Sequence, residues 1–220
     1  MSSLFSEDNL YVQALKESYK MLALDLTMYE AAVESLRHSD TGEINIDVYK
    51  LDKQINEYER DVRKKVMTHL SVTGARDLAP GLILVSVVID IERIGDYTKN
   101  IYDLARKHPL RLVAPLIEDD LQAAEASVTS IFRNMIKAFK SSDEDQARQI
   151  MEEYKESTSA MCDEITTGIV AGKIDDLSSA DAATVALYAR YLKRIAAHSR
   201  NIITSVVNPF DRIGYQYKEK

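Results

Sequence analysis

The hydrophobic and polar positions of this chain follow the period of an α-helix. Apolar residues recur at spacings of three and four through most of the sequence, which favours amphipathic helices over strands. Prolines help to divide the pattern, since Pro80 is tolerated in a first helical turn whereas Pro109 forbids further helix. We therefore predict six helices, the first capped by Asp8, over about residues 8–37, 46–70, 76–107, 116–139, 141–170 and 178–207.

The composition fits a helical protein with a sizeable core. Of 220 residues, 45% are hydrophobic and 29% charged, but only seven are Gly and four are Pro, too few for the turns of a β-sandwich or a doubly wound fold. The longest nearly uncharged run, residues 78–89, is too short to cross a bilayer, and Asp90 follows it directly. We expect no direct insertion into a membrane.

The charge and the cysteine content of the sequence indicate in which compartment the protein works and what kind of partner it binds. The net charge is −7 and the basic residues are interspersed with acids, so nucleic acid is not an expected partner. Cys162 is the single cysteine and cannot form an internal disulfide, and no secretory signal pattern opens the sequence. We expect a cytoplasmic protein whose counterparts are cations or basic protein surfaces.

Two segments of the sequence resemble each other. IERIGDYTKNI at residue 91 and LKRIAAHSRNI at residue 192 are offset by 101 residues and share Arg, Ile, Asn and Ile at matching places. Each follows two other predicted helices, which indicates a duplicated three-helix unit. The expected fold is all-α, with six long helices in two tandem three-helix bundles, residues 1–108 and residues 109–220, the second ending in a short tail.

The third predicted helix carries acids within its most apolar part. Successive residues of a helix turn by about 100°, so Glu92 and Asp96 lie about 40° apart on one face, with Arg93 nearby. Gly95 stands between the acids, at a cost of about 1 kcal/mol relative to Ala. That cost is understandable if another group must approach the backbone closely at this point.

A matching polar stripe lies on the second predicted helix. Asp52, Asn56 and Glu59 share one face there. If the two stripes meet, their carboxylates repel one another and need a cation, a proton or a basic side chain between them. Oxygen donors without paired His or Cys suit Mg, Mn, Ca or iron better than a structural Zn. The alternative is that the acids are solvated, or are neutralised by Arg93 and nearby lysines.

These segments resemble a known family. DIERIGDYTKNI, residues 90–101, resembles the DLERIGDxAxNI signature of the PhoU family of phosphate-signalling proteins. The segment LDKQINEYE looks like the family's DxxIN segment, RDL at residue 76 sits where the family has ARDLR, and a weaker likeness extends over nearly the whole chain.

The resemblance implies a fold, a metal site and partners. It implies two three-helix bundles and metal clusters held by E/D-xxx-D pairs, here Glu92 with Asp96 and Asp52 with Asn56. It also implies a regulator without catalysis that connects the ATPase of a phosphate ABC transporter to a phosphate-sensing histidine kinase. Through such partners the protein would lie at the inner face of the membrane, and a homodimer is also compatible with the resemblance.

The second repeat departs from the family pattern. Lys193 stands where the first repeat has Glu92, and Ala197 where it has Asp96. On the preceding helix, Glu153 and Ser157 replace the Asp and Asn. We therefore expect at most one well-formed metal site, in the first half, and we expect the imidazole of His198 at the surface.

The leading hypothesis is a non-enzymatic, metal-binding regulator of phosphate uptake and phosphate-starvation signalling. Its divalent or ferric ion would bind to Asp52, Asn56, Glu92 and Asp96, with Glu59 and Asp90 supporting these ligands and Arg93 orienting one carboxylate. The alternative is a helical interaction module for another inorganic-ion transporter, with no bound metal. A third interpretation, a carboxylate-bridged metalloenzyme, finds no HExxH or ExxH pair and no phosphate-binding loop in the sequence.

Overall fold

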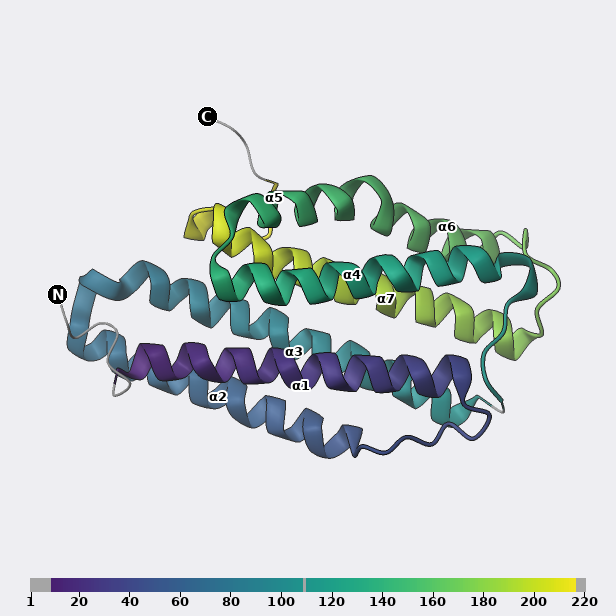
Figure 1. The fold of residues 1–220 in the computed structure, drawn as a ribbon, viewed down its shortest axis with the longest axis horizontal. Helices are drawn as coiled ribbons and strands as arrows, with labels where there is room; N and C mark the ends of the chain where they lie inside the picture. The colour runs from purple at the N-terminus through teal and green to yellow at the C-terminus, as the bar shows by residue number, and fades with distance from the viewer. Residues whose placement is uncertain (1–8, 109, 217–220) are drawn as a thin grey trace.

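Every regular element that the structure describes is a helix. The structure, a computed structural model, describes residues 9–108 and 110–216, and it contains no strand within these ranges (Figure 1). The helices are α1 (Leu10–His38), α2 (Val48–Thr73), α3 (Leu78–Lys107), α4 (Glu118–Ser141), α5 (Glu144–Glu153), α6 (Ser159–Val170) and α7 (Ser179–Val207). Short 3₁₀ turns occupy Gly74–Asp77, Pro115–Ile117 and Phe210–Arg212. None of the described helices combines the length and the apolar character that a membrane span requires.

Side-chain caps and glycine fix the helix ends close to their predicted places. Asp8, the predicted cap of the first helix, lies outside the described residues, and Asn9 caps α1 by accepting the backbone N–H of Tyr11 at 2.8 Å. The side chain of Asp47 caps α2, and Gly74, at φ +63°, ends it in a left-handed conformation that favours glycine. Pro80 falls in the first turn of α3, as the sequence predicts.

The fifth predicted helix contains a widened turn. A π-helical segment, Tyr154–Thr158, joins α5 to α6, and the backbone N–H of Ser159 donates to the carbonyl of Tyr154. Buried side chains continue along the same face on both sides of it, from Ile150 to Cys162. The apolar spacing therefore could not distinguish this turn from regular α-helix.

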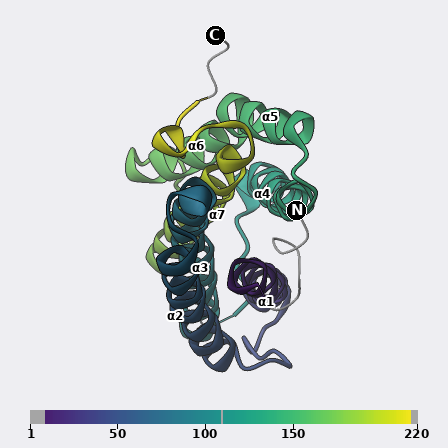
Figure 2. The same ribbon diagram turned by 90° about the vertical axis from the view of Figure 1, so that its left-hand side faces the viewer.

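The helices form two three-helix bundles that share one hydrophobic core. The first bundle consists of α1, α2 and α3, and the second of α4, the α5–α6 rod and α7 (Figures 1 and 2). α3 and α7 lie at the centre, because each contacts its own bundle and the other (Figure 2). A single cluster of buried apolar residues extends through both bundles, with Tyr29 and Tyr188 among its largest side chains.

The contact between α3 and α7 reflects the internal repeat. The offset of 101 residues relates Tyr97 to His198 and Asp90 to Tyr191. The rings of Tyr97 and His198 stack at 5.7 Å, Asp90 Oδ1 lies 2.6 Å from His198 Nδ1, and the rings of Tyr97 and Tyr191 lie 6.0 Å apart. Asp90 thus contacts His198, and the equivalent residues Tyr191 and Tyr97 contact each other in turn. Such reciprocal contacts are expected for two units related by an approximate two-fold axis. His198 is buried at this contact, so the expectation that it is a surface residue is wrong.

A buried arginine ties the first bundle to the chain segment that enters the second. Arg37 of α1 donates through Nε to Glu125 of α4 at 2.7 Å, and it also binds Glu118 and the backbone carbonyl of Leu112. Its side chain is only 4% exposed. A buried charge of this kind is tolerated only with such complete pairing.

Candidate functional site

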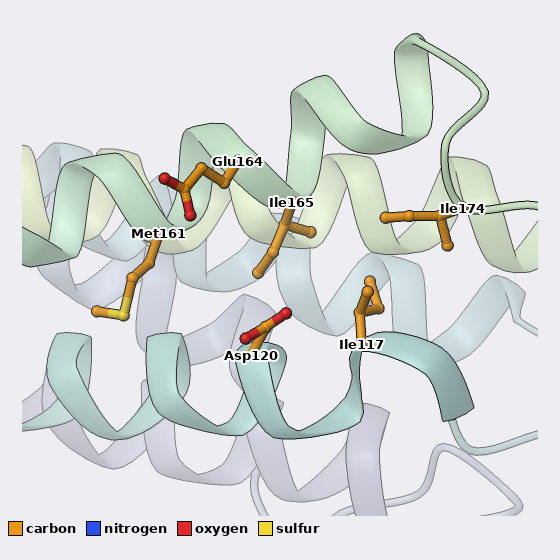
Figure 3. A pocket seen from close by; sticks show the side chains of 6 residues that line it. All are labelled: Ile117, Asp120, Met161, Glu164, Ile165 and Ile174. Carbon is orange, nitrogen blue, oxygen red and sulfur yellow. The ribbon is translucent and has the colours of Figure 1, made fainter.

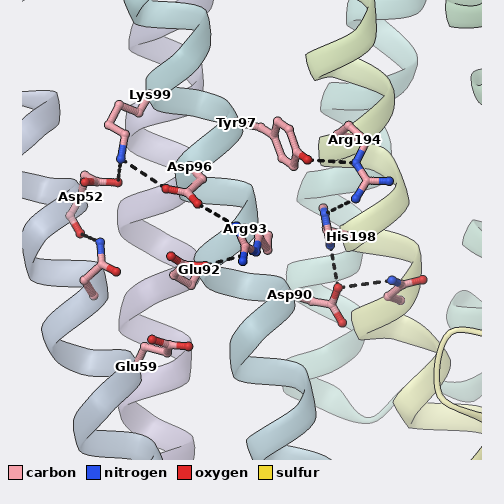
Figure 4. A network of polar contacts seen from close by, with 12 residues as sticks. Asp52, Glu59, Asp90, Glu92, Arg93, Asp96, Tyr97, Lys99, Arg194 and His198 are labelled. Carbon is pink, nitrogen blue, oxygen red and sulfur yellow. Dashed lines mark hydrogen bonds and ion pairs between the residues drawn. The ribbon is translucent and has the colours of Figure 1, made fainter.

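The two predicted acidic stripes meet, and a lysine lies between them. Lys99 Nζ on α3 donates to Asp52 Oδ1 of α2 at 2.8 Å and to Asp96 Oδ1 of its own helix at 3.2 Å (Figure 4). Burial opposes the charge of Lys99, but its bonds to the two acids outweigh burial and raise its pKa. The sequence predicts that a cation, a proton or a basic side chain neutralises the stripes. The structure contains the basic side chain, Lys99.

Arg93 contacts Glu92 and Asp96, both on its own helix, more loosely than Lys99 contacts its partners. Its Nη1 lies 3.2 Å from Asp96 Oδ2, and its Nε lies 3.7 Å from Glu92 Oε2 (Figure 4). The arginine side chain is 54% exposed, so solvent screens these pairs. Burial, followed by the charge of Asp96, raises the pKa of Glu92 despite Arg93, and the charges of Glu59 and Asp52 act in the same direction.

A fourth carboxylate, absent from the sequence prediction, completes the cluster. Asp25 of α1 is fully buried, and neither of its carboxylate oxygens has a hydrogen-bond partner. Burial raises its pKa well above the ordinary value, and the charges of Glu92, Asp52 and Asp96 raise it further. We call Asp25, Asp52, Glu92 and Asp96 the acidic seam. Three helices, α1, α2 and α3, contribute to it.

Gly95 is the residue that gives Asp25 its place. A Cβ atom at position 95 would lie 2.7 Å from Asp25 Oδ1, closer than real Cβ atoms approach an oxygen. Glycine is therefore required at position 95 because the carboxylate of Asp25, on α1, occupies the space that a side chain there would fill. A signal for it exists in MLALDLTMY, residues 21–29, where one acid interrupts an apolar stripe at helical spacing. Asp25 was not predicted as a site residue, because it stands alone among apolar residues and shares no helical face with a second acid.

The other predicted site residues lie at different distances from the seam. The Asn56 Nδ2 donates to the backbone carbonyl of Asp52 on its own helix at 3.0 Å, and Glu59 pairs with Arg63 at 2.7 Å. Glu59 still acts electrostatically on the seam, as its effect on the pKa of Glu92 indicates. Asp90 is not brought to the seam, since it faces α7 and binds His198 (Figure 4).

The seam is arranged around Lys99 rather than around an empty coordination point. Among the described residues, no group of three or more His, Cys, Asp or Glu side chains is disposed to hold a metal ion. Asp52 and Asp96 turn toward the lysine ammonium, whereas Asp25 stays unpaired. The donor types are those of a site for a hard cation, but the arrangement is that of an ion pair with one carboxylate left over.

The equivalent positions of the second repeat make different contacts. Lys193 pairs with Asp163, and Arg194 donates to the hydroxyl of Tyr97 at 3.1 Å across the bundle contact. Arg200, the counterpart of Lys99, lies over the ring of Tyr154 at 5.3 Å. These basic residues do not converge with acids as in the first repeat.

A hollow in the second bundle offers little to an enzyme. It lies between α4 and α6, has a volume of about 150 Å³, and is lined mainly by aliphatic side chains, with Asp120 and Glu164 among them (Figure 3). Pockets that enclose small-molecule ligands usually measure about 300–1,000 Å³. This hollow shares no lining residue with the acidic seam.

The fold and the seam together define a class of protein. It is an all-helical protein of two tandem three-helix bundles, with a cluster of four carboxylates in the first bundle, one of them fully buried and unpartnered. The sequence model of the PhoU domain matches residues 19–105 and again residues 124–206, one match in each bundle. The chain therefore belongs to the PhoU family.

Solved structures share the fold. The crystal structure of PhoU from Pseudomonas aeruginosa matches with a TM-score of 0.81 at 22% identity, over 92% of this chain and 97% of that one. The phosphate transport system regulatory protein PhoU from Streptococcus pneumoniae matches with a TM-score of 0.70 at 18% identity, over 90% of this chain and 93% of that one. No curated protein sequence matches the chain. At these identities the structural matches speak for the fold alone.

Proposed function

We propose that this protein is a metal-binding adaptor that regulates phosphate uptake and phosphate-starvation signalling. In this role it connects the ATPase of a phosphate ABC transporter to a phosphate-sensing histidine kinase, at the inner face of the membrane. Membership of the PhoU family in both repeats supports the regulatory part of the proposal. The observation that carries the metal-binding part is the unpaired carboxylate of Asp25 in the acidic seam.

The chemistry of the seam fits a hard cation. Three carboxylates, Asp52 on α2 and Glu92 and Asp96 on α3, act electrostatically on Asp25, while one lysine and one exposed arginine supply positive charge to them. A buried carboxylate without a partner is costly unless a proton or a cation compensates it. Oxygen donors of this kind suit Mg, Mn, Ca or ferric ions better than a structural Zn. The ligands in this proposal are Asp25, Asp52, Glu92 and Asp96.

The residues of the seam would link metal binding to the shape of the first bundle. A bound ion would supply positive charge that α1, α2 and α3 share. Its carboxylate ligands then hold the three helices together, which stabilises the folded state increasingly as the free metal concentration rises above the Kd. Because α1 and α2 also face away from the second bundle, metal occupancy would alter the surface that a partner meets.

Thermal unfolding tests the metal-binding part. In wild-type protein stripped with EDTA, adding Mn²⁺ or Mg²⁺ at 100 times its Kd should stabilise the fold by about 2.7 kcal/mol. Asp96→Asn should abolish most of this shift. Asp163→Asn, which removes an acid of the second repeat, should leave it intact. A wild-type shift no larger than that of the Asp96 variant would refute metal binding at the seam.

Co-purification tests the adaptor part. Affinity capture of the full chain from phosphate-replete cells of the source organism should recover the ATPase of a phosphate transporter and a histidine kinase. Elemental analysis of the same preparation reports bound metal. If instead the components of a different inorganic-ion transporter were recovered and no metal were found, the alternative of a helical interaction module without metal would replace the proposal.

A further inference from the structure

The acidic seam already contains a positive charge that belongs to the protein. The Lys99 ammonium is the only basic group for which the described contacts include acids of both α2 and α3 within the seam. Its side chain is 24% exposed, and Asp52, its nearer partner, is 16% exposed. The ion pair is therefore partly sheltered from solvent, where opposite charges attract more strongly than at an open surface.

We propose that Lys99 is a built-in counter-cation that holds the acidic seam together in the metal-free protein and that a metal ion must displace. The inference deepens the proposed function, because it concerns how the metal site in that proposal is controlled. It assigns a role to a residue that the sequence analysis did not single out. The consequence is that Lys99 sets the affinity of the seam for metal.

Lysine and metal would use the same oxygen atoms. Lys99 Nζ takes Oδ1 of Asp52 and Oδ1 of Asp96, and these atoms face one point between α2 and α3 (Figure 4). A cation bound there would repel the ammonium at short range, so the two cannot occupy the point together. A lysine side chain is flexible and strongly hydrated at its tip, and this one is partly exposed, so it can swing into solvent.

Arg93 cannot take the same part. Its two contacts go to Glu92 and Asp96, both on its own helix, so it does not tie α3 to α2. It is also more than half exposed, and it would remain beside a metal-bound Asp96 without occupying the space between the helices.

The second repeat provides an internal comparison. Arg200 stands at the position equivalent to Lys99, but the position equivalent to Asp96 is occupied by Ala197, which carries no charge. There the guanidinium lies over the ring of Tyr154 and donates to the carbonyl of Gly214. Glu153 keeps an acid at the position equivalent to Asp52, but without an equivalent of Asp96 the basic residue takes other partners. The placement of Lys99 follows from the seam and not from the backbone alone.

Lys99 leaves the deepest acid uncompensated. Asp25 is fully buried near Gly95 of α3, close enough to Asp52 and Asp96 for their charges to raise its pKa, and neither of its oxygens receives a hydrogen bond. A metal ion in the seam would meet this carboxylate in addition to the two that Lys99 releases. Displacement is thus favoured by an extra ligand that the lysine does not reach.

Metal titration of a lysine variant tests the inference. Lys99→Met keeps the length of the side chain and removes its charge. By isothermal titration of EDTA-stripped protein, this variant should bind Mn²⁺ at least tenfold more tightly than the wild type, and without metal it should have a lower thermal midpoint. Lys65→Met is the matched control, because Lys65 pairs with Glu17 of α1 at similar exposure but away from the seam. That control should lose stability without gaining affinity for Mn²⁺.

The outcomes separate this inference from the proposed function. If wild type and Lys99→Met bind Mn²⁺ equally, Lys99 is no competitor, and the metal site itself stands. If only the variant binds, the inference is supported and the proposal that the natural protein binds metal fails. If neither binds, both fail. Lys99→Arg keeps the charge and should bind Mn²⁺ no more tightly than the wild type, and Lys99→Gln provides the same comparison as Lys99→Met with a polar side chain.

Discussion

The contact between Gly95 and Asp25 gives the sharpest test of the seam's geometry. In Gly95→Ala the new methyl carbon would lie 2.7 Å from Asp25 Oδ1 and 3.4 Å from Ile55 Cδ1. Carbon and oxygen atoms in proteins rarely approach closer than about 3.3 Å, so the methyl group is short of room by about 0.6 Å on the side of the carboxylate. The contact with the isoleucine is ordinary. The substitution therefore tests the carboxylate alone.

Two opposing effects set the size of the change. Replacing Gly by Ala inside a helix gains about 1 kcal/mol, whereas forcing a methyl group into a tightly packed, buried position costs about 1–3 kcal/mol. Asp25 is fully buried, so it cannot move into solvent to make room. We expect Gly95→Ala to lower the free energy of unfolding by about 1 kcal/mol in the wild-type background.

A double-mutant cycle isolates the contact. In the Asp25→Ala background the obstacle is gone, so Gly95→Ala should instead raise the free energy of unfolding by about 1 kcal/mol, which gives a coupling of about 2 kcal/mol between the two positions. Urea denaturation followed by circular dichroism, in EDTA at neutral pH, measures all four proteins. Effects that add within about 0.5 kcal/mol would refute the close approach of Asp25 to the α3 backbone.

Two further predictions concern buried charges. The pKa of Asp25 is higher in the folded state than in the unfolded chain. Above the ordinary pKa of an aspartate, the folded state therefore keeps a proton that the unfolded chain has already released. As a result, the free energy of unfolding falls as the pH rises. In EDTA the stability of Asp25→Asn relative to wild type should therefore increase with pH above about 4, by up to about 1.4 kcal/mol per unit, and a difference independent of pH would contradict this. Arg37→Met should lower the free energy of unfolding by about 3–5 kcal/mol because it leaves Glu125 buried without its partner, and adding Glu125→Gln should restore part of the loss in urea denaturation.

Helical periodicity together with the internal repeat predicted the fold. The apolar spacing, the caps and the prolines place the helices within a few residues, because in a long amphipathic helix each of these local signals supports the same structure. The repeat between residues 91 and 192 indicates the two bundles, and the PhoU-domain matches fall one in each. The π-helical turn at Tyr154–Thr158 was not predictable, since it leaves the buried face continuous.

The two acidic stripes, on α2 and α3, were predictable from spacing, but the third helix that joins them was not. Spacing shows that Glu92 and Asp96 share a face, and the cost of Gly95 indicates a close neighbour. Which neighbour it is depends on how α1 packs against α3, and no local pattern contains that information. Lys99 was missed for a related reason: a lysine among acids on a helix is usually solvated, and only the position of α2 turns it into a bridge.

The two faces of α3 connect the seam to the contact between the bundles. Glu92 and Asp96 face α2, whereas Asp90 and Tyr97 face α7, so one helix carries both sets of contacts (Figure 4). These residues alternate along little more than two turns of α3. Any change of charge that shifts α3 against α2 must therefore also be accommodated at the contact with α7. If the seam binds a cation as proposed, the position of its acids on α3 places that cation on the same helix that forms the contact with the second bundle.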